Sequence, residues 1–149
     1  QGESGRSGQA GGQVDWSRAG DLYDAVMDRI RSEFPRAGDL TMLGAHSSHS
    51  YQTGTNLYFV YDYTISCSPR EEIEVYHKPL NAIIVTEALR MGGSMVHHHG
   101  IGKYRTAWVR QEHGSARISL LKPSLSALPV HTAANACSNN APARSRSIG

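Results

Sequence analysis

The sequence has few cysteines, no long apolar run and no excess of either charge. Its 149 residues include only two cysteines, Cys67 and Cys137, which stand far apart without metal-type spacing. So few cysteines suit a reducing compartment, and we expect a cytoplasmic protein. No apolar run reaches the length of a membrane span, and no signal peptide is visible. We therefore expect no transmembrane segment.

The charges nearly cancel. The chain has 15 lysines and arginines against 13 aspartates and glutamates, a formal net charge of +2. A dedicated nucleic-acid-binding domain usually carries a clustered basic face, so we expect no nucleic-acid partner. The first residue is Gln rather than Met, which indicates a fragment of a longer protein.

Both ends of the chain lack apolar periodicity. Residues 1–14 are rich in Gly, Gln and Ser, and residues 122–149 are rich in Ser, Ala, Asn and Arg with three prolines. Neither end can bury enough apolar surface to offset the entropy lost on ordering. We predict a disordered lead or linker over 1–14, a domain over 15–121, and a disordered tail over 122–149 of the kind that a frameshift produces.

Three helices are predicted within this domain. An apolar residue recurs at every fourth position between Trp16 and Pro35, which predicts a helix that the proline ends. The recurring residues are Leu22, Val26, Ile30 and Phe34. Residues 70–91 favour a second helix, kinked at Pro79 and ended by two glycines. Residues 103–112 favour a third.

Strands are predicted at residues 40–50, 55–65 and 94–99, the first two as an antiparallel hairpin. The second strand alternates between two faces. Its expected core face carries Leu57, Phe59, Tyr61, Tyr63 and Ile65, and its other face carries Asn56, Tyr58, Val60, Asp62 and Thr64. The more polar second face is a candidate to line a site. The order of elements indicates an α+β fold, an antiparallel β-sheet with helices packed on one face.

Three adjacent histidines, His97, His98 and His99, lie between glycines on the third predicted strand. Successive side chains of a strand point to opposite faces, so His97 and His99 share a side. Three interpretations stay open: a metal site completed by His46 and His49, a structural role, or proton transfer and cofactor contact, which suit a group that titrates near neutral pH.

Two further features are candidates for chemistry. Gly100 and Gly102 precede Lys103 and Arg105 at a predicted helix start, where backbone amides and basic side chains favour phosphate. The alternative is a tight turn before a solvated helix. The Tyr58 phenol is either a packing group or a proton donor and acceptor.

Three stretches of the sequence together resemble a known family. They are residues 54–59 (GTNLYF), residues 92–94 (GGS) and residues 97–103 (HHHGIGK). Over about residues 15–121 the chain resembles the C-terminal domain of FAD-linked oxidases of the vanillyl-alcohol oxidase type, nearest to the alkyldihydroxyacetonephosphate synthases and their bacterial relatives.

The resemblance implies a substrate or cap domain over FAD, with the cofactor held mainly by a separate FAD-binding domain that this chain does not contain. It implies that Tyr58 is the catalytic proton donor or acceptor. His97, His98 and His99 would be catalytic and cofactor-binding, together with Asn56 on the cofactor. The expected substrate is a small or lipid-like molecule, held by the phosphate-binding group of Gly100, Gly102, Lys103 and Arg105. A homodimer is also implied.

The function that this resemblance favours is that of an alkylglycerone-phosphate synthase, which exchanges alkyl for acyl on a dihydroxyacetone phosphate ester in ether lipid synthesis. One alternative is an FAD-dependent oxidoreductase of a hydroxy acid or alcohol, in which His98 or a neighbour takes the hydroxyl proton. A non-enzyme alternative is a small metal-binding module built from His97, His99 and His49. His46 stands where the synthases carry an arginine, which weakens the synthase assignment.

Overall fold

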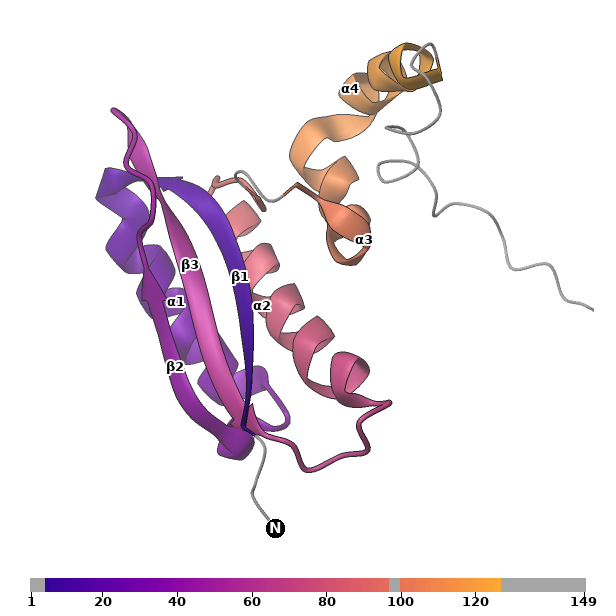
Figure 1. Ribbon diagram of the computed structural model, residues 1–149. Coiled ribbons are helices and arrows are strands. Elements are labelled where there is room, and N and C mark those ends of the chain that lie inside the picture. The colour runs from indigo at the N-terminus through magenta and orange to yellow at the C-terminus, as the bar shows by residue number, and fades with distance from the viewer. Residues whose placement is uncertain (1–4, 97–99, 127–149) are drawn as a thin grey trace, which may run out of the picture. The chain divides into compact units, whose positions relative to one another are not determined.

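The computed structural model describes residues 5–96 and 100–126 (Figure 1). The chain divides into two units, residues 1–100 and residues 101–149, which are described separately. The first unit contains a three-stranded sheet in the order β1-β3-β2. Its strands are β1 (Gly5–Asp15), β2 (Leu40–His46) and β3 (Gly54–Thr64), and both pairings are antiparallel. The antiparallel hairpin predicted for residues 40–50 and 55–65 is confirmed by the pairing of β2 with β3.

Helix α1 (Ala19–Glu33) follows a 3₁₀ turn at Trp16–Arg18. Its buried side chains recur at helical spacing and face the sheet: Leu22, Val26, Met27 and Ile30. Phe34 is extended, as a residue before proline usually is, so Pro35 ends the helix as predicted.

Strand β3 is the central strand, and one of its faces forms the core with the two helices. Leu57, Phe59, Tyr61 and Tyr63 are all buried in that core, which confirms the alternation read from the sequence. The rings of Tyr63 and Tyr76 stack with their centroids 4.4 Å apart, which adds Tyr76 to this core.

Helix α2 (Lys78–Arg90) packs beside α1 on the same face of the sheet (Figure 1). A π-helical turn, Ile73–His77, comes immediately before it. The expected irregularity in the second helix therefore lies just ahead of Pro79, which occupies the first turn of α2. Proline is tolerated there because the first turn needs no backbone N–H donor.

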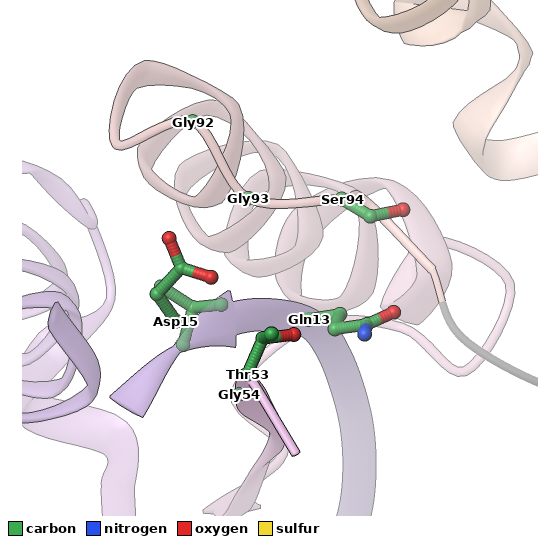
Figure 2. Close-up of a pocket in the computed structure, with 8 residues that line it drawn as sticks. Gln13, Asp15, Thr53, Gly54, Gly92, Gly93 and Ser94 are labelled. Carbon is green, nitrogen blue, oxygen red and sulfur yellow. The ribbon is translucent and has the colours of Figure 1, made fainter. Parts of the chain in front are cut away.

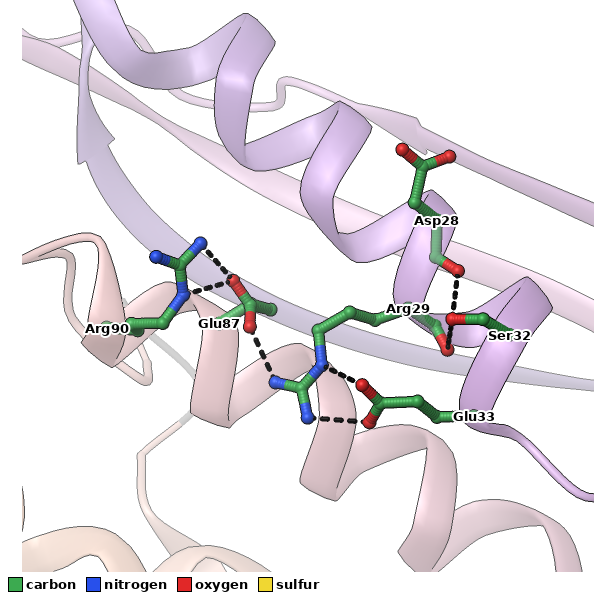
Figure 3. Close-up of polar contacts among 6 residues, drawn as sticks. All are labelled: Asp28, Arg29, Ser32, Glu33, Glu87 and Arg90. Atoms are coloured by element: carbon green, nitrogen blue, oxygen red, sulfur yellow. Dashed lines mark hydrogen bonds and ion pairs between the residues drawn. The ribbon is translucent and has the colours of Figure 1, made fainter.

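An ion-pair network joins α1 to α2 (Figure 3). The buried Glu87 carboxylate accepts hydrogen bonds from Arg29 Nη1 at 2.5 Å and from Arg90 Nε at 2.8 Å. Arg29 also holds Glu33 through two bonds of 2.9 and 2.7 Å. The two carboxylates raise the pKa of the Arg29 guanidinium, since they stabilise its charged form.

The expectation of a disordered lead over residues 1–14 is wrong from Gly5 onward, because β1 occupies Gly5–Asp15. Glycine-rich composition gives β1 little strand propensity of its own. The strand forms because it pairs with β3 along its whole length, from Gly5 opposite Thr64 to Asp15 opposite Gly54. Residues 1–4 lie outside the described part of the chain.

The second unit is helical where it is described. The predicted helix over 103–112 is divided into α3 (Gly102–Arg105), a 3₁₀ turn at Thr106–Trp108 and the beginning of α4 (Val109–Ser126). Gly114 interrupts α4 with φ 71° and ψ 163°, where the sequence predicted an end, but helix resumes after it. The tail predicted from residue 122 is helical as far as Ser126, and its remainder lies outside the described residues.

Across residues 5–96 and 100–126, none of the helices combines the length and apolar character that a membrane span needs.

Candidate functional site

The sheet has a second face, opposite the helices, which carries Asn56, Tyr58 and His46 and is called the site face here. Asn56 and Tyr58 alternate with the core residues of β3, and His46 pairs directly with Tyr58 across the ladder. Side chains of directly opposed residues in an antiparallel pair lie on the same face. The prediction that this face carries Asn56 and Tyr58 is therefore confirmed by the register.

His46 and Tyr58 form a flat stack on the site face. Their ring centroids are 5.5 Å apart and their planes differ by 11°. Only 8% of the Tyr58 surface is exposed, whereas His46 is exposed. On the other side of Tyr58 the opposed residue of β1 is Gly11, which has no side chain. The His46 imidazole therefore covers one flank of the Tyr58 ring.

Asn56 lies beside Tyr58 at the start of β3 and has no exposed surface. Its Oδ1 accepts the His49 backbone N–H at 2.7 Å, and its Nδ2 donates to Ser48 Oγ at 3.0 Å. Thr55 Oγ1 donates to the His49 carbonyl at 3.0 Å. These bonds hold the loop that follows β2. Periodicity in the sequence does not reveal them, although Ser, Thr and Asn beside a strand end commonly bond to nearby backbone.

A glycine-rich junction fixes the chain just ahead of the histidines (Figure 2). Gln13 and Ser94 exchange two backbone hydrogen bonds, of 3.1 and 2.9 Å. A Cβ on Gly12 would meet the Ser94 carbonyl, and one on Gly93 would meet the Gln13 carbonyl, both closer than 3.0 Å. Only glycine allows this approach. Gly92 and Gly93 follow the end of α2, as their sequence pattern predicts, but that pattern does not reveal this second role.

The same junction borders a cleft of about 230 Å³. Its lining comes from three chain segments (Figure 2): Gln13, Val14, Asp15, Thr53, Gly54, Gly92, Gly93 and Ser94. Beyond the junction Met95 is fully buried, and Ser94 Oγ donates to the Val96 carbonyl at 2.8 Å. The chain leading to residue 97 is therefore anchored to β1.

His97, His98 and His99 lie outside the described residues. Elsewhere in the described part of the chain, no three His, Cys, Asp or Glu side chains gather as a metal site would require. His49 lies in the loop held by Asn56, where Ser48 Oγ is 3.0 Å from its Nδ1. The histidine metal site therefore stays a prediction.

The four expected phosphate-binding residues belong to different units. Gly100 ends the first unit, whereas Gly102, Lys103 and Arg105 lie in α3 of the second. Lys103 Nζ lies 5.0 Å from the ring centroid of Tyr104. Helix α3 has only four residues, too few for the aligned peptide dipoles of a longer helix N-terminus. Phosphate binding by this group also stays a prediction.

Two ionisable groups with shifted pKa values lie at the far end of β3 from the site. Burial, and next the hydrogen bond to Glu72, raise the pKa of Tyr63 to about 12. Hydrogen bonds from Ser66 at 2.6 Å and Tyr76 at 2.5 Å lower the pKa of Asp39, and Arg36 adds to the effect. Neither Tyr63 nor Asp39 lies on the site face.

Known proteins give the family context. The family model of the FAD linked oxidases, C-terminal domain, matches residues 12–124. The uncharacterized FAD-linked oxidoreductase YgcU of Escherichia coli K12 is 64% identical over 102 residues, which are 68% of this chain and 21% of that protein. The alkyldihydroxyacetonephosphate synthase of Caenorhabditis elegans is 28% identical over 111 residues, 73% of this chain and 18% of that protein.

A solved structure of an alkyldihydroxyacetonephosphate synthase has a similar fold, with a TM-score of 0.50 and 19% identity, over 62% of this chain and 16% of that one. The chain thus spans about a fifth of the length of the curated relatives that it matches. The family match covers most of the described residues, including the whole site face. The chain belongs to the FAD-linked oxidase family and corresponds to its C-terminal domain.

Proposed function

We propose that the chain is the substrate-side part of an FAD-dependent oxidoreductase that acts on an alcohol or hydroxy acid. The observation that carries the proposal is the buried Tyr58 phenol stacked against His46 on the sheet face free of α1 and α2. The 64% identity to a protein named an FAD-linked oxidoreductase favours this activity over the synthase reaction.

The described residues suit the reacting end of FAD better than its pyrophosphate. The Tyr58 phenol, held against the His46 imidazole, offers a hydroxyl that can carry a proton. The glycine-rich segment is strand β1, whose backbone pairs with β3 throughout, so it does not cradle a phosphate. This supports a separate FAD-binding domain as partner.

Oxidation of an alcohol to a carbonyl removes a hydride from carbon and a proton from oxygen. FAD, when bound, supplies the hydride acceptor. In the proposal this chain handles the proton: Tyr58 accepts or donates it, and His97, His98 and His99 orient the substrate and relay it. A positioned group of this kind contributes about 10²–10⁴-fold to a rate.

The test uses the full-length protein that carries this segment, loaded with FAD and kept free of oxygen. Addition of alcohols and hydroxy acids should bleach the flavin absorbance, and Tyr58→Phe should slow bleaching by about 10²-fold or more. Tyr23→Phe is the matched control, because Tyr23 lies on α1 and stacks on the core ring Phe59. Equal rates for both variants and the wild type would exclude Tyr58 from the reaction.

The alkyl-for-acyl exchange of an alkylglycerone-phosphate synthase is the second candidate. The 28% identity to a protein named alkyldihydroxyacetonephosphate synthase favours it, with Lys103 and Arg105 as phosphate ligands. An acyl ester of dihydroxyacetone phosphate and a fatty alcohol should then give an ether product without net flavin reduction. Ether formation would replace the oxidoreductase proposal, and bleaching by an alcohol would exclude the exchange as the main activity.

A further inference from the structure

The loop between β2 and β3 is held at three consecutive residues by the start of β3. Thr55 Oγ1 lies 2.5 Å from Ser47 Oγ and donates to the His49 carbonyl. Asn56 contacts Ser48 and His49 through its side chain, and its backbone N–H donates to the His49 carbonyl at 3.3 Å. Because Thr55 and Asn56 are almost fully buried, the attachment is shielded from competition by water.

The bonds of the Asn56 amide argue against direct contact with a ligand. An asparagine side chain offers one oxygen acceptor and one NH₂ donor group. The oxygen accepts the His49 N–H at 2.7 Å and the nitrogen donates to Ser48 Oγ at 3.0 Å. None of its surface is exposed, and both bonds join its side chain to the loop.

The held loop continues directly from the residue that stacks on Tyr58. His46 is the last residue of β2, and Ser47–His49 follow it in the chain. Asn56 and Tyr58 are alternate residues on one face of β3, so the loop attachment and the stack are adjacent. Any displacement of Ser48 and His49 therefore moves the end of β2 that presents His46.

We propose that Asn56 is a positioning residue for the Tyr58 site: by fixing Ser48 and His49 it keeps the His46 imidazole stacked on the Tyr58 phenol. The proposal rests on the proposed function of Tyr58 for its catalytic consequence. Its structural part stands independently of FAD, because the loop, the stack and Asn56 all belong to this chain.

The structural part is tested by NMR on the chain with Asn56→Leu. Release of the loop should speed hydrogen exchange of the His49 amide by about tenfold, the effect of one hydrogen bond. It should also move the His46 ring resonances, since the ring current of the stacked phenol is lost. Asn81→Leu is the matched control. It removes another buried amide, which bonds to Tyr61 and His77 on the core face, and should leave both signals unchanged.

Ser48→Ala keeps the test decisive if Asn56→Leu does not fold. It keeps the bond from the His49 N–H to Asn56 Oδ1 but removes Ser48 Oγ, which contacts both the Asn56 nitrogen and the His49 ring. It should produce smaller changes of the same sign at His49 and His46. Ser32→Ala, which removes an exposed hydroxyl on α1, is its control. Unchanged His49 exchange and His46 resonances in Ser48→Ala and in folded Asn56→Leu would overturn the proposal.

The catalytic part is tested in the flavin-loaded full-length protein. Asn56→Leu should lower kcat more than it raises KM and should shift the pH profile of flavin reduction, whereas Asn81→Leu should leave the profile in place. A released loop with an unshifted profile would overturn the positioning role. If Tyr58→Phe itself has no effect on flavin reduction, the proposed function fails. The NMR experiment would still show whether Asn56 holds the loop and the His46–Tyr58 stack in place.

Discussion

Arg29 on α1 and Glu87 on α2 are joined by a 2.5 Å ion pair that leaves the glutamate side chain 3% exposed. Arg90, three residues further along α2, also contacts this carboxylate: its Nη2 lies 2.7 Å from Glu87 Oε2. A buried charge is tolerated only with such partners. The pair therefore adds a polar contact between α1 and α2 to their apolar packing in the core.

Glu87→Gln is predicted to lower the free energy of unfolding by about 2 kcal/mol, because it removes the buried charge that both arginines contact. Glu74→Gln is the control, since the Glu74–Lys78 pair is exposed and should be worth less than about 1 kcal/mol. Urea unfolding of both variants measures the difference. Equal losses would show that the Glu87 network adds nothing beyond a surface pair.

Gly93→Ala is predicted to destabilise the protein by about 2 kcal/mol or more, because the added methyl meets the Gln13 carbonyl and forces the backbone apart. Loss of protection at the Ser94 amide, which donates to Gln13, should accompany it in hydrogen exchange. Gly38→Ala has open space around the new methyl and should stay within about 0.5 kcal/mol of the wild type. Retained Ser94 protection in Gly93→Ala would contradict the account of the junction.

Asp39 is predicted to make stability depend on pH at the acid end. Its pKa is lower in the folded state than in the unfolded state, chiefly through Ser66 and then Tyr76. The unfolded state thus takes up the proton first, so stability present above about pH 4 is lost as the pH falls through the folded pKa. Urea midpoints measured against pH should fall less steeply in Asp39→Asn and in Ser66→Ala. If the urea midpoints of both variants fell with acid as steeply as those of the wild type, the assignment to Asp39 would be wrong.

The Tyr63 phenol is predicted to lose its proton at a higher pH than an ordinary tyrosine. Its pKa of about 12 lies above the ordinary tyrosine value, since burial and Glu72 disfavour the phenolate. Stability contributed by the neutral phenol is complete below about pH 10 and is lost as the pH rises towards 12. Ultraviolet titration should show a phenol that loses its proton near pH 12, that is missing in Tyr63→Phe and that titrates at lower pH in Glu72→Gln. A late phenol that persists in Tyr63→Phe would belong to another tyrosine.

Regular patterns in the sequence predicted the core well. The fourfold spacing in α1 and the alternation in β3 identified Leu22, Val26, Phe59 and Tyr61 as core residues, because burial on one face imposes the period of the element. The same alternation placed Tyr58 on the opposite face. In α1 and β3 the residue spacing within the element alone therefore shows which side chains face the core.

Strand β1 and the loop attachment at Asn56 could not be predicted in this way. The glycines of β1 indicate flexibility when considered alone, and only their pairing with β3 and the close approach of Ser94 explain them. The resemblance implies that Asn56 contacts the cofactor, and this stays a prediction; polarity on a sheet face indicates a site without identifying the partner of each residue. Its bonds to Ser48 and His49 depend on a turn whose geometry the sequence does not specify.

The central place of β3 has a consequence for assembly. β2 and β3 are neighbours in the chain and can pair early, whereas β1 must close a long loop across α1 before the sheet is complete. Loss of β1 would uncover one whole edge of β3, a row of unpaired backbone groups of the kind on which strands of other molecules can pair.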